Sequence, residues 1–190
     1  MKRTDNAARV AGDLGRSLRV WRALRRMKQG HAAELLGVSQ ATVSRWESGH
    51  QVPTPPEREA LRALMAARLD GAADHALGRL VRGSARQAHL VCDLTHRLLA
   101  ASPARERRWK VSASELIGTS MWRFHTEAIA RAEAALPALG WYGETPPGIE
   151  VLTGANESRE VPIRRGRCRW TRLRLSDGSY ARLVETEAAA

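Results

Sequence analysis

The sequence predicts a mainly α N-terminal domain of five helices followed by an α+β domain. Between residues 13 and 82, apolar residues recur at intervals of three and four, which is the spacing of amphipathic helices. After Gly83-Ser84 this spacing gives way to short strand-like runs and a hairpin turn at residues 176–179. We therefore place one domain at residues 13–83 and a second at residues 86–186.

Five segments of the first half have helical spacing. They cover residues 13–27, 29–36, 39–47, 57–69 and 72–82. Gly37 can end the second segment because glycine readily adopts the left-handed backbone of a helix C-terminus. Ser39 can cap the third because its hydroxyl accepts a bond from an otherwise unpaired backbone N–H. In the last segment we expect Ala76, Leu77 and Leu80 to face inward.

The helices at 29–36 and 39–47 are separated by only two residues, 37 and 38. Two helices joined by so tight a turn can bind DNA, with the second in the major groove and the first across the phosphate backbone. We expect Trp46 to be buried where these helices pack together. Gln40 and Arg45 face outward, and their side chains can pair with adenine and guanine respectively.

These residues resemble the lambda-repressor and Cro family, the XRE-type helix-turn-helix regulators. The resemblance is carried by Leu18-Arg19, Trp21-Arg22, Gln29, Ala33, Gly37-Val38-Ser39-Gln40, Thr42-Val43-Ser44-Arg45-Trp46-Glu47 and Gly49. It implies a DNA-binding surface made of Lys28, Gln29, Ser39, Gln40, Ala41, Thr42, Ser44, Arg45, Ser48 and His50. It also implies a structural ion pair between Arg22 and Glu47.

The resemblance implies a sequence-specific, DNA-binding transcriptional regulator. We expect a dimeric repressor that reads a palindromic operator in double-stranded DNA with the helix at 39–47. The alternative is a DNA-binding antitoxin of a toxin–antitoxin pair, whose C-terminal domain would bind a protein partner. In both cases we expect a soluble, cytoplasmic and nucleoid-associated bacterial protein, because no run approaches the roughly 18 apolar residues that span a bilayer.

The second half resembles a PAS domain. Strands are expected at residues 89–93, 98–100, 167–175 and 180–184, and helices at 103–109, 112–117 and 125–136, while 140–159 is too rich in Gly and Pro to place. The likeness is carried by Asp93 and residues 97–103 and 115–120. It implies a sensor or dimerisation domain. An unclassified α+β dimerisation domain and a small β-barrel sensor such as a cupin are the alternatives.

The tryptophans of the second half have two interpretations. Trp109, Trp122, Trp141 and Trp170 can line a ligand pocket, or they can belong to the core or a dimer interface. No cofactor is predicted, and a small-molecule ligand of this domain is left open.

The net charge and the sequence motifs narrow the possible functions further. The chain carries 31 Lys and Arg against 20 Asp and Glu, a net charge of +11, which favours a polyanionic partner, either nucleic acid or an acidic membrane surface. Cys92 and Cys168 stand in neither a CxxC nor a zinc-like cluster, so we expect reduced thiols and no metal. We find no catalytic motif, and we expect no enzyme.

Overall fold

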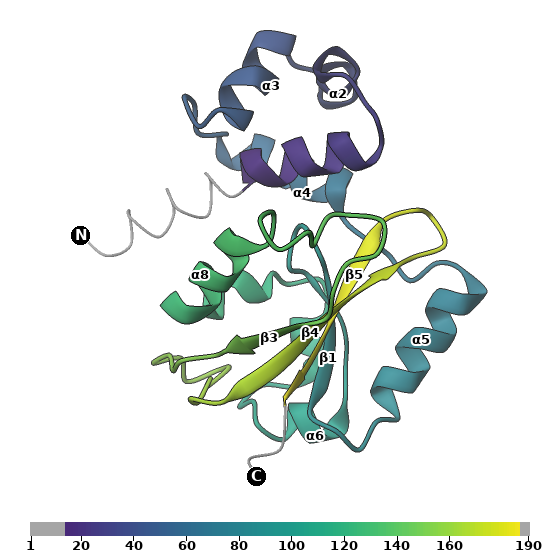
Figure 1. The fold of residues 1–190 in the computed structure, drawn as a ribbon, viewed down its shortest axis with the longest axis vertical. Coiled ribbons are helices and arrows are strands. Elements are labelled where there is room, and N and C mark those ends of the chain that lie inside the picture. The colour runs from purple at the N-terminus through teal and green to yellow at the C-terminus, as the bar shows by residue number, and fades with distance from the viewer. Residues whose placement is uncertain (1–13, 187–190) are drawn as a thin grey trace. The chain divides into compact units, whose positions relative to one another are not determined.

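The computed structural model describes residues 14–186, which form two compact units, 14–66 and 67–186 (Figure 1). The first unit contains a helix at residues 14–24, α2 (Gln29–Leu36), α3 (Gln40–Glu47) and α4 (Pro55–Met65). Within residues 14–186, no helix is both long enough and apolar enough to span a bilayer.

Buried apolar side chains from all four helices form the core of the first unit. These are Leu14, Leu18, Trp21, Ala32, Ala33, Val43, Trp46, Leu61 and Met65. The expected burial of Trp46 is confirmed, since only 2% of the residue is exposed. At Gly15 an added Cβ would lie 2.0 Å from the Trp46 carbonyl oxygen, so the first helix lies directly against α3 at a point that only glycine allows.

The caps of these helices follow the local sequence. Gly37 has a left-handed φ of 65° after α2, and the Ser39 hydroxyl accepts a 3.1 Å bond from the Thr42 N–H at the start of α3. Helix α4 begins and ends earlier than the predicted 57–69. It begins at Pro55 because the Glu57 carboxylate accepts from the Thr54 N–H at 2.6 Å, which caps the first turn. It ends at Met65 because Ala66 has extended backbone.

The second unit is built on an antiparallel sheet of five strands. These are β1 (Ala88–Cys92), β2 (Leu98–Ala101), β3 (Ile149–Leu152), β4 (Arg167–Arg174) and β5 (Tyr180–Thr186), in the order β2-β1-β5-β4-β3. Between β2 and β3 the chain forms α6 (Pro103–Glu106), α7 (Ala113–Leu116), η1 (Met121–Phe124) and α8 (Glu127–Ala135). The predicted PAS-like α+β fold is confirmed by this arrangement. Strand β3 lies in the segment that the sequence left unplaced.

Helix α5 (Ala72–Arg82) is the fifth helix within residues 14–186 and packs against β1 and β2 in the second unit. Val81 shares a buried cluster with Leu90 and Cys92, and Leu77 packs against that cluster. The chain therefore divides into compact units between 66 and 67, whereas the sequence placed the boundary at Gly83. The inward orientation expected for Leu80 is wrong: the residue is 73% exposed. It lies about 100° around the helix from Val81.

The two faces of the sheet are covered by different elements. Leu90 and Cys92 of β1 face the cluster that includes α5, while Val91 packs with Trp109, Leu116 and Phe124 from the region between β2 and β3. Figure 1 shows α5 and α8 on opposite sides of the sheet. The alternation of β1 side chains thus separates two apolar layers, as the pleat of a strand requires.

A buried network of charges ties β1, β4, β5 and α8 together. Arg172 and Arg182 are direct partners on β4 and β5, and Asp93 follows β1. The Asp93 carboxylate accepts from Arg172 Nε at 2.8 Å and from Arg182 Nε at 2.9 Å. Arg182 Nη1 also donates to Glu133 of α8 at 2.5 Å, and Trp141 Nε1 donates to Asp93 at 3.1 Å. Two carboxylates therefore balance two guanidinium groups.

The network shifts the acidity of its members. Burial by itself would raise the pKa of Glu133, but the charge of Arg182, together with the neighbouring His96 side chain, outweighs that effect and holds this pKa well below its usual range. Burial likewise opposes the charged form of Arg182, yet Glu133 and Asp93 raise the Arg182 pKa above its ordinary value. Both groups are therefore ionised in the folded domain at neutral pH.

Glu133→Gln should lower the free energy of unfolding at pH 7 by about 3–5 kcal/mol, because it leaves Arg182 undercompensated in the interior. The folded pKa of Glu133 is depressed, so its contribution is complete above the unfolded value of about 4.3 and declines as the pH falls below it. Urea denaturation between pH 2 and pH 7 should show the difference from wild type shrinking in acid. Glu127→Gln is the control, since this residue lies on the same helix with an 85% exposed side chain. A pH-independent difference would contradict the prediction.

Candidate nucleic-acid interface

The turn between α2 and α3 presents a polar surface. Seven of the ten residues expected there are exposed, namely Lys28, Ser39, Gln40, Ala41, Arg45, Ser48 and His50, while Gln29, Thr42 and Ser44 are half-buried. All ten come from α2, α3 and the residues that flank them. The buried side of α3 carries Val43 and Trp46, which hold this surface on the core.

A chain of side-chain hydrogen bonds connects this surface to the first helix. Arg22 donates from Nε and Nη2 to the two carboxylate oxygens of Glu47, at 2.6 and 2.7 Å. Gln29 Nε2 donates to the same carboxylate at 2.9 Å, and its Oε1 accepts from Gln40 Nε2 at 2.8 Å. Gln40, at the start of α3, is thereby linked to a carboxylate at the end of that helix.

Arg22 also fixes the chain between the first helix and α2. Its Nη1 donates to the Met27 carbonyl oxygen at 2.6 Å. The hydrogen bond to Glu47 raises the pKa of Arg22 against the opposing effect of burial. The guanidinium thus satisfies backbone and side-chain acceptors at once, which a lysine could not do with the same geometry.

Local side-chain bonds order the two ends of α3. At its N-terminus the hydroxyls of Ser39 and Thr42 lie 2.8 Å apart. At its C-terminus the Ser48 hydroxyl donates to the Ser44 carbonyl at 2.8 Å and lies 2.7 Å from His50 Nδ1. Polar side chains of the expected DNA-binding surface are therefore held in place at both ends of α3.

The first helix and the turn that follows it add positive charge to this unit. Arg19, Arg25 and Arg26 are exposed, and the Arg25 guanidinium lies over the Trp21 ring, 5.2 Å from its centroid. Arg19, Arg25 and Arg26 make up a basic face of this unit. Sequence reasoning identified the pairing of Arg22 with Glu47. It missed the link through Gln29 to Gln40, because residue spacing does not reveal which polar side chains meet across a turn.

Comparison with known proteins bears on the first unit. Residues 13–76 match a family model described as a helix-turn-helix domain. The helix-turn-helix domain so matched includes α2, the turn at Gly37 and α3, and it reaches into α5. No curated protein matches the chain.

Solved structures are also similar to this chain. One is the PAS domain of an HTR-like protein from Haloarcula marismortui, with 18% identity and a TM-score of 0.38, covering 60% of this chain and 96% of that one. Another is an RNA-binding light-oxygen-voltage receptor, with 11% identity and a TM-score of 0.43, covering 98% of this chain and 62% of that one.

Glu47→Gln should weaken the helix-turn-helix domain because Arg22 and Gln29 lose a charged acceptor. The expected loss is about 1.5–3 kcal/mol, as for hydrogen bonds to charged groups. Native-state amide hydrogen exchange of α2 and α3 measures this loss in the full-length protein. Glu34→Gln, an exposed change on α2, is the matched control. Equal protection in the two variants would show that the carboxylate of Glu47 does not support the domain.

Proposed function

We propose that this protein is a DNA-binding transcription regulator of the lambda-repressor and Cro type, with α3 as the helix that reads double-stranded DNA. The observation that carries this proposal is the exposed polar face of α3, set on a buried core and linked through Gln29 to the Arg22–Glu47 pair. The match to a helix-turn-helix domain supports it.

Gln40 and Arg45 are the proposed base-reading residues. One N–H of the Gln40 amide is used by Gln29, which leaves Oε1 and a second N–H for the two-point contact that an amide makes with adenine. Arg45 is exposed, and its side chain makes no hydrogen bond or ion pair with residues 14–186. Its guanidinium group can therefore donate two hydrogen bonds to guanine. Ala41 offers only its methyl group.

Residues that flank the two helices are assigned to the phosphate backbone. Lys28, Ser48 and His50 flank α2 and α3, and phosphate contacts of this kind set the register without reading sequence. We assign Gln29 a phosphate contact through its remaining amide N–H. The net charge of +11 supports binding to a polyanion and makes that binding salt-dependent.

We further propose that the protein acts as a dimeric repressor in the bacterial cytoplasm, at the nucleoid. One recognition helix covers only a few base pairs, so useful genomic specificity requires two, about one helical turn apart on a palindrome. The PAS-like domain is the proposed site of pairing, since it offers the edge strands β2 and β3. Repression needs only occupancy of the operator.

Arg45→Ala should cost about 1–3 kcal/mol on the preferred DNA site and relax the preference at one position of each half-site, because one base contact is lost. Arg25→Ala removes a cation of the basic face and should weaken binding to all sequences about equally. Binding to a randomised DNA library, followed by sequencing of the bound fraction, measures both effects. If Arg45→Ala weakened binding uniformly with every base preference intact, α3 would not be the reading helix.

The full-length protein should sediment as a dimer of 21.0 kDa protomers and protect two symmetric half-sites. Tethering two reading heads raises the effective concentration of the second, so a palindrome should bind much more tightly than a single half-site. Sedimentation equilibrium and footprinting measure these properties. A monomer that binds a half-site and a palindrome with equal affinity would contradict the dimer proposal.

A further inference from the structure

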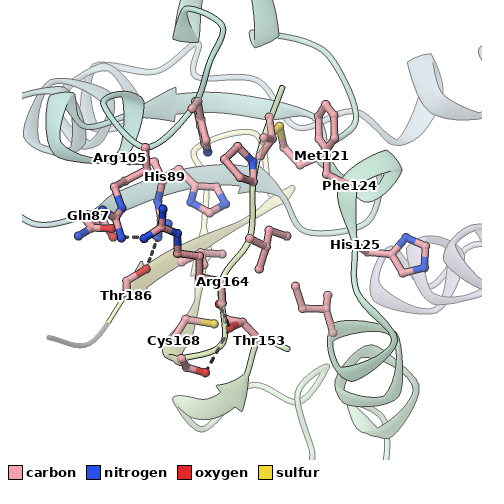
Figure 2. Close-up of a pocket in the computed structure, with 18 of the residues that line it drawn as sticks. Gln87, His89, Arg105, Met121, Phe124, His125, Thr153, Arg164, Cys168 and Thr186 are labelled. Atoms are coloured by element: carbon pink, nitrogen blue, oxygen red, sulfur yellow. Dashed lines mark hydrogen bonds between the residues drawn. The ribbon is translucent and has the colours of Figure 1, made fainter. Parts of the chain in front are cut away.

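The PAS-like domain contains a cavity of about 960 Å³ (Figure 2). Its volume is typical of small-molecule sites. One side is the face of the sheet that carries His89 and Val91 of β1 and Trp170 of β4. Apolar side chains of the region between β2 and β3 line the other side, including Trp109, Met121 and Phe124. The fold therefore leaves room for a ligand within this one domain.

The lining of this cavity is unbalanced in charge. Eight of its lining residues are Lys or Arg, and none is Asp or Glu. Arg182 is among them, but Asp93 and Glu133 neutralise it. The other basic side chains give the cavity a positive potential, and a cavity with low-dielectric walls concentrates such a field. An anion would be attracted to it.

Arg105 is a cation of this lining without a countercharge. Its Nη2 donates to the Gln87 carbonyl at 3.0 Å and to the Thr186 hydroxyl at 2.6 Å, while its Nε is buried without a hydrogen-bond partner. Within residues 14–186 it forms no ion pair with a carboxylate. Burial lowers the pKa of Arg105 to about 10, so the group stays charged at neutral pH. An unpaired charge in such a place is costly unless something binds it.

His89 provides a second unsatisfied group beside Arg105. Its Nδ1 is buried and has no hydrogen-bond partner within the described part of the chain. The ring is held by edge-on packing against Trp109, with the centroids 5.9 Å apart. Burial, and then the charge of Arg105, keep the pKa of His89 well below its usual value, so the ring is neutral at pH 7. A neutral imidazole can donate one hydrogen bond to an anion.

Polar and apolar groups are separated within the cavity. Figure 2 shows Arg105, His89, Gln87 and Thr186 together, with Met121 and Phe124 apart from them. A ligand that satisfies both regions needs an anionic group at one end and an apolar body at the other. A planar carboxylate fits a guanidinium well because it can accept two parallel N–H bonds.

We propose that this cavity binds a small organic carboxylate, with the carboxylate group at Arg105 and His89 and an apolar, preferably aromatic, body against Trp109, Met121 and Phe124. This inference goes beyond the proposed function and does not depend on DNA binding. A protein that failed to bind DNA could still bind the carboxylate, and the reverse also holds, so the two proposals fail separately.

The test uses the full-length protein with 1-naphthoate as the probe and neutral 1-naphthamide, of nearly the same shape, as its control. Isothermal titration at constant ionic strength should show saturable binding of naphthoate with one site per chain. Naphthamide should bind about 10- to 100-fold more weakly, the range expected when a charged hydrogen bond is lost. Equal affinity for acid and amide, or no saturable binding of naphthoate, would overturn the proposal.

Substitutions locate the binding site. Arg105→Met should weaken naphthoate binding about 10- to 100-fold, while Arg79→Gln, which removes an exposed cation of α5 outside the cavity, should leave it unchanged. His89→Phe keeps an aromatic ring against Trp109 but removes both nitrogens, and it should weaken naphthoate more than naphthamide. This second variant decides the matter if Arg105→Met does not fold. Wild-type affinity for naphthoate in folded variants at both positions would show that the anion binds elsewhere.

Discussion

The PAS-like domain depends on the ion pairs that the Asp93 carboxylate makes with two buried arginines. Arg172 and Arg182 are direct partners on β4 and β5, and two like charges in that position repel each other. Asp93 binds both guanidinium groups, with nearest distances of 2.8 Å to each, and so links the end of β1 to the two strands. Glu133 then attaches α8 to Arg182. Aromatic rings also contact the two guanidinium groups. The Arg172 guanidinium lies 3.5 Å from the centroid of the Tyr180 ring, and that of Arg182 lies 4.5 Å from the centroid of the Trp170 ring.

This arrangement separates two kinds of positive charge in one domain. Arg172 and Arg182 are compensated, and burying them serves the fold even though isolated buried ions would destabilise it. Arg105 lines the cavity of the same domain and has neutral acceptors only, the Gln87 carbonyl and the Thr186 hydroxyl. The low dielectric of the interior strengthens the ion pairs of Arg172 and Arg182. The same low dielectric makes the unpaired charge of Arg105 costly. Compensated charge thus holds the sheet and α8 together, while uncompensated charge is available to a ligand.

Local features could be predicted from the sequence, and contacts between distant residues could not. Helices α2 and α5 have the predicted bounds because glycine caps and apolar spacing are local signals. The hairpin between β4 and β5 forms at Gly178, with its φ of 79°, for the same reason. Strand β3 was left unplaced because its pairing with β4 defines it. The compact units divide after residue 66 rather than at Gly83 because α5 packs on a sheet formed later in the chain. At the candidate interface the exposed residues were predicted, but their hydrogen bonds across the turn were not.

Those hydrogen bonds affect how the helix-turn-helix domain would recognise a base. A long polar side chain loses rotamer freedom when it binds, and this loss opposes affinity. Gln40 has already lost part of that freedom because Gln29 and Glu47 restrain it before any DNA is present. Arg45 is exposed and unrestrained by the described residues, so its side chain would have to become ordered when the proposed complex with DNA forms. In the proposed complex with DNA, Gln40 would therefore make a weaker, neutral contact at a smaller entropic cost, whereas Arg45 would make a stronger, charged contact at a larger one. Under this proposal, the two contributions to base discrimination would be closer in size than the charges of the side chains alone suggest.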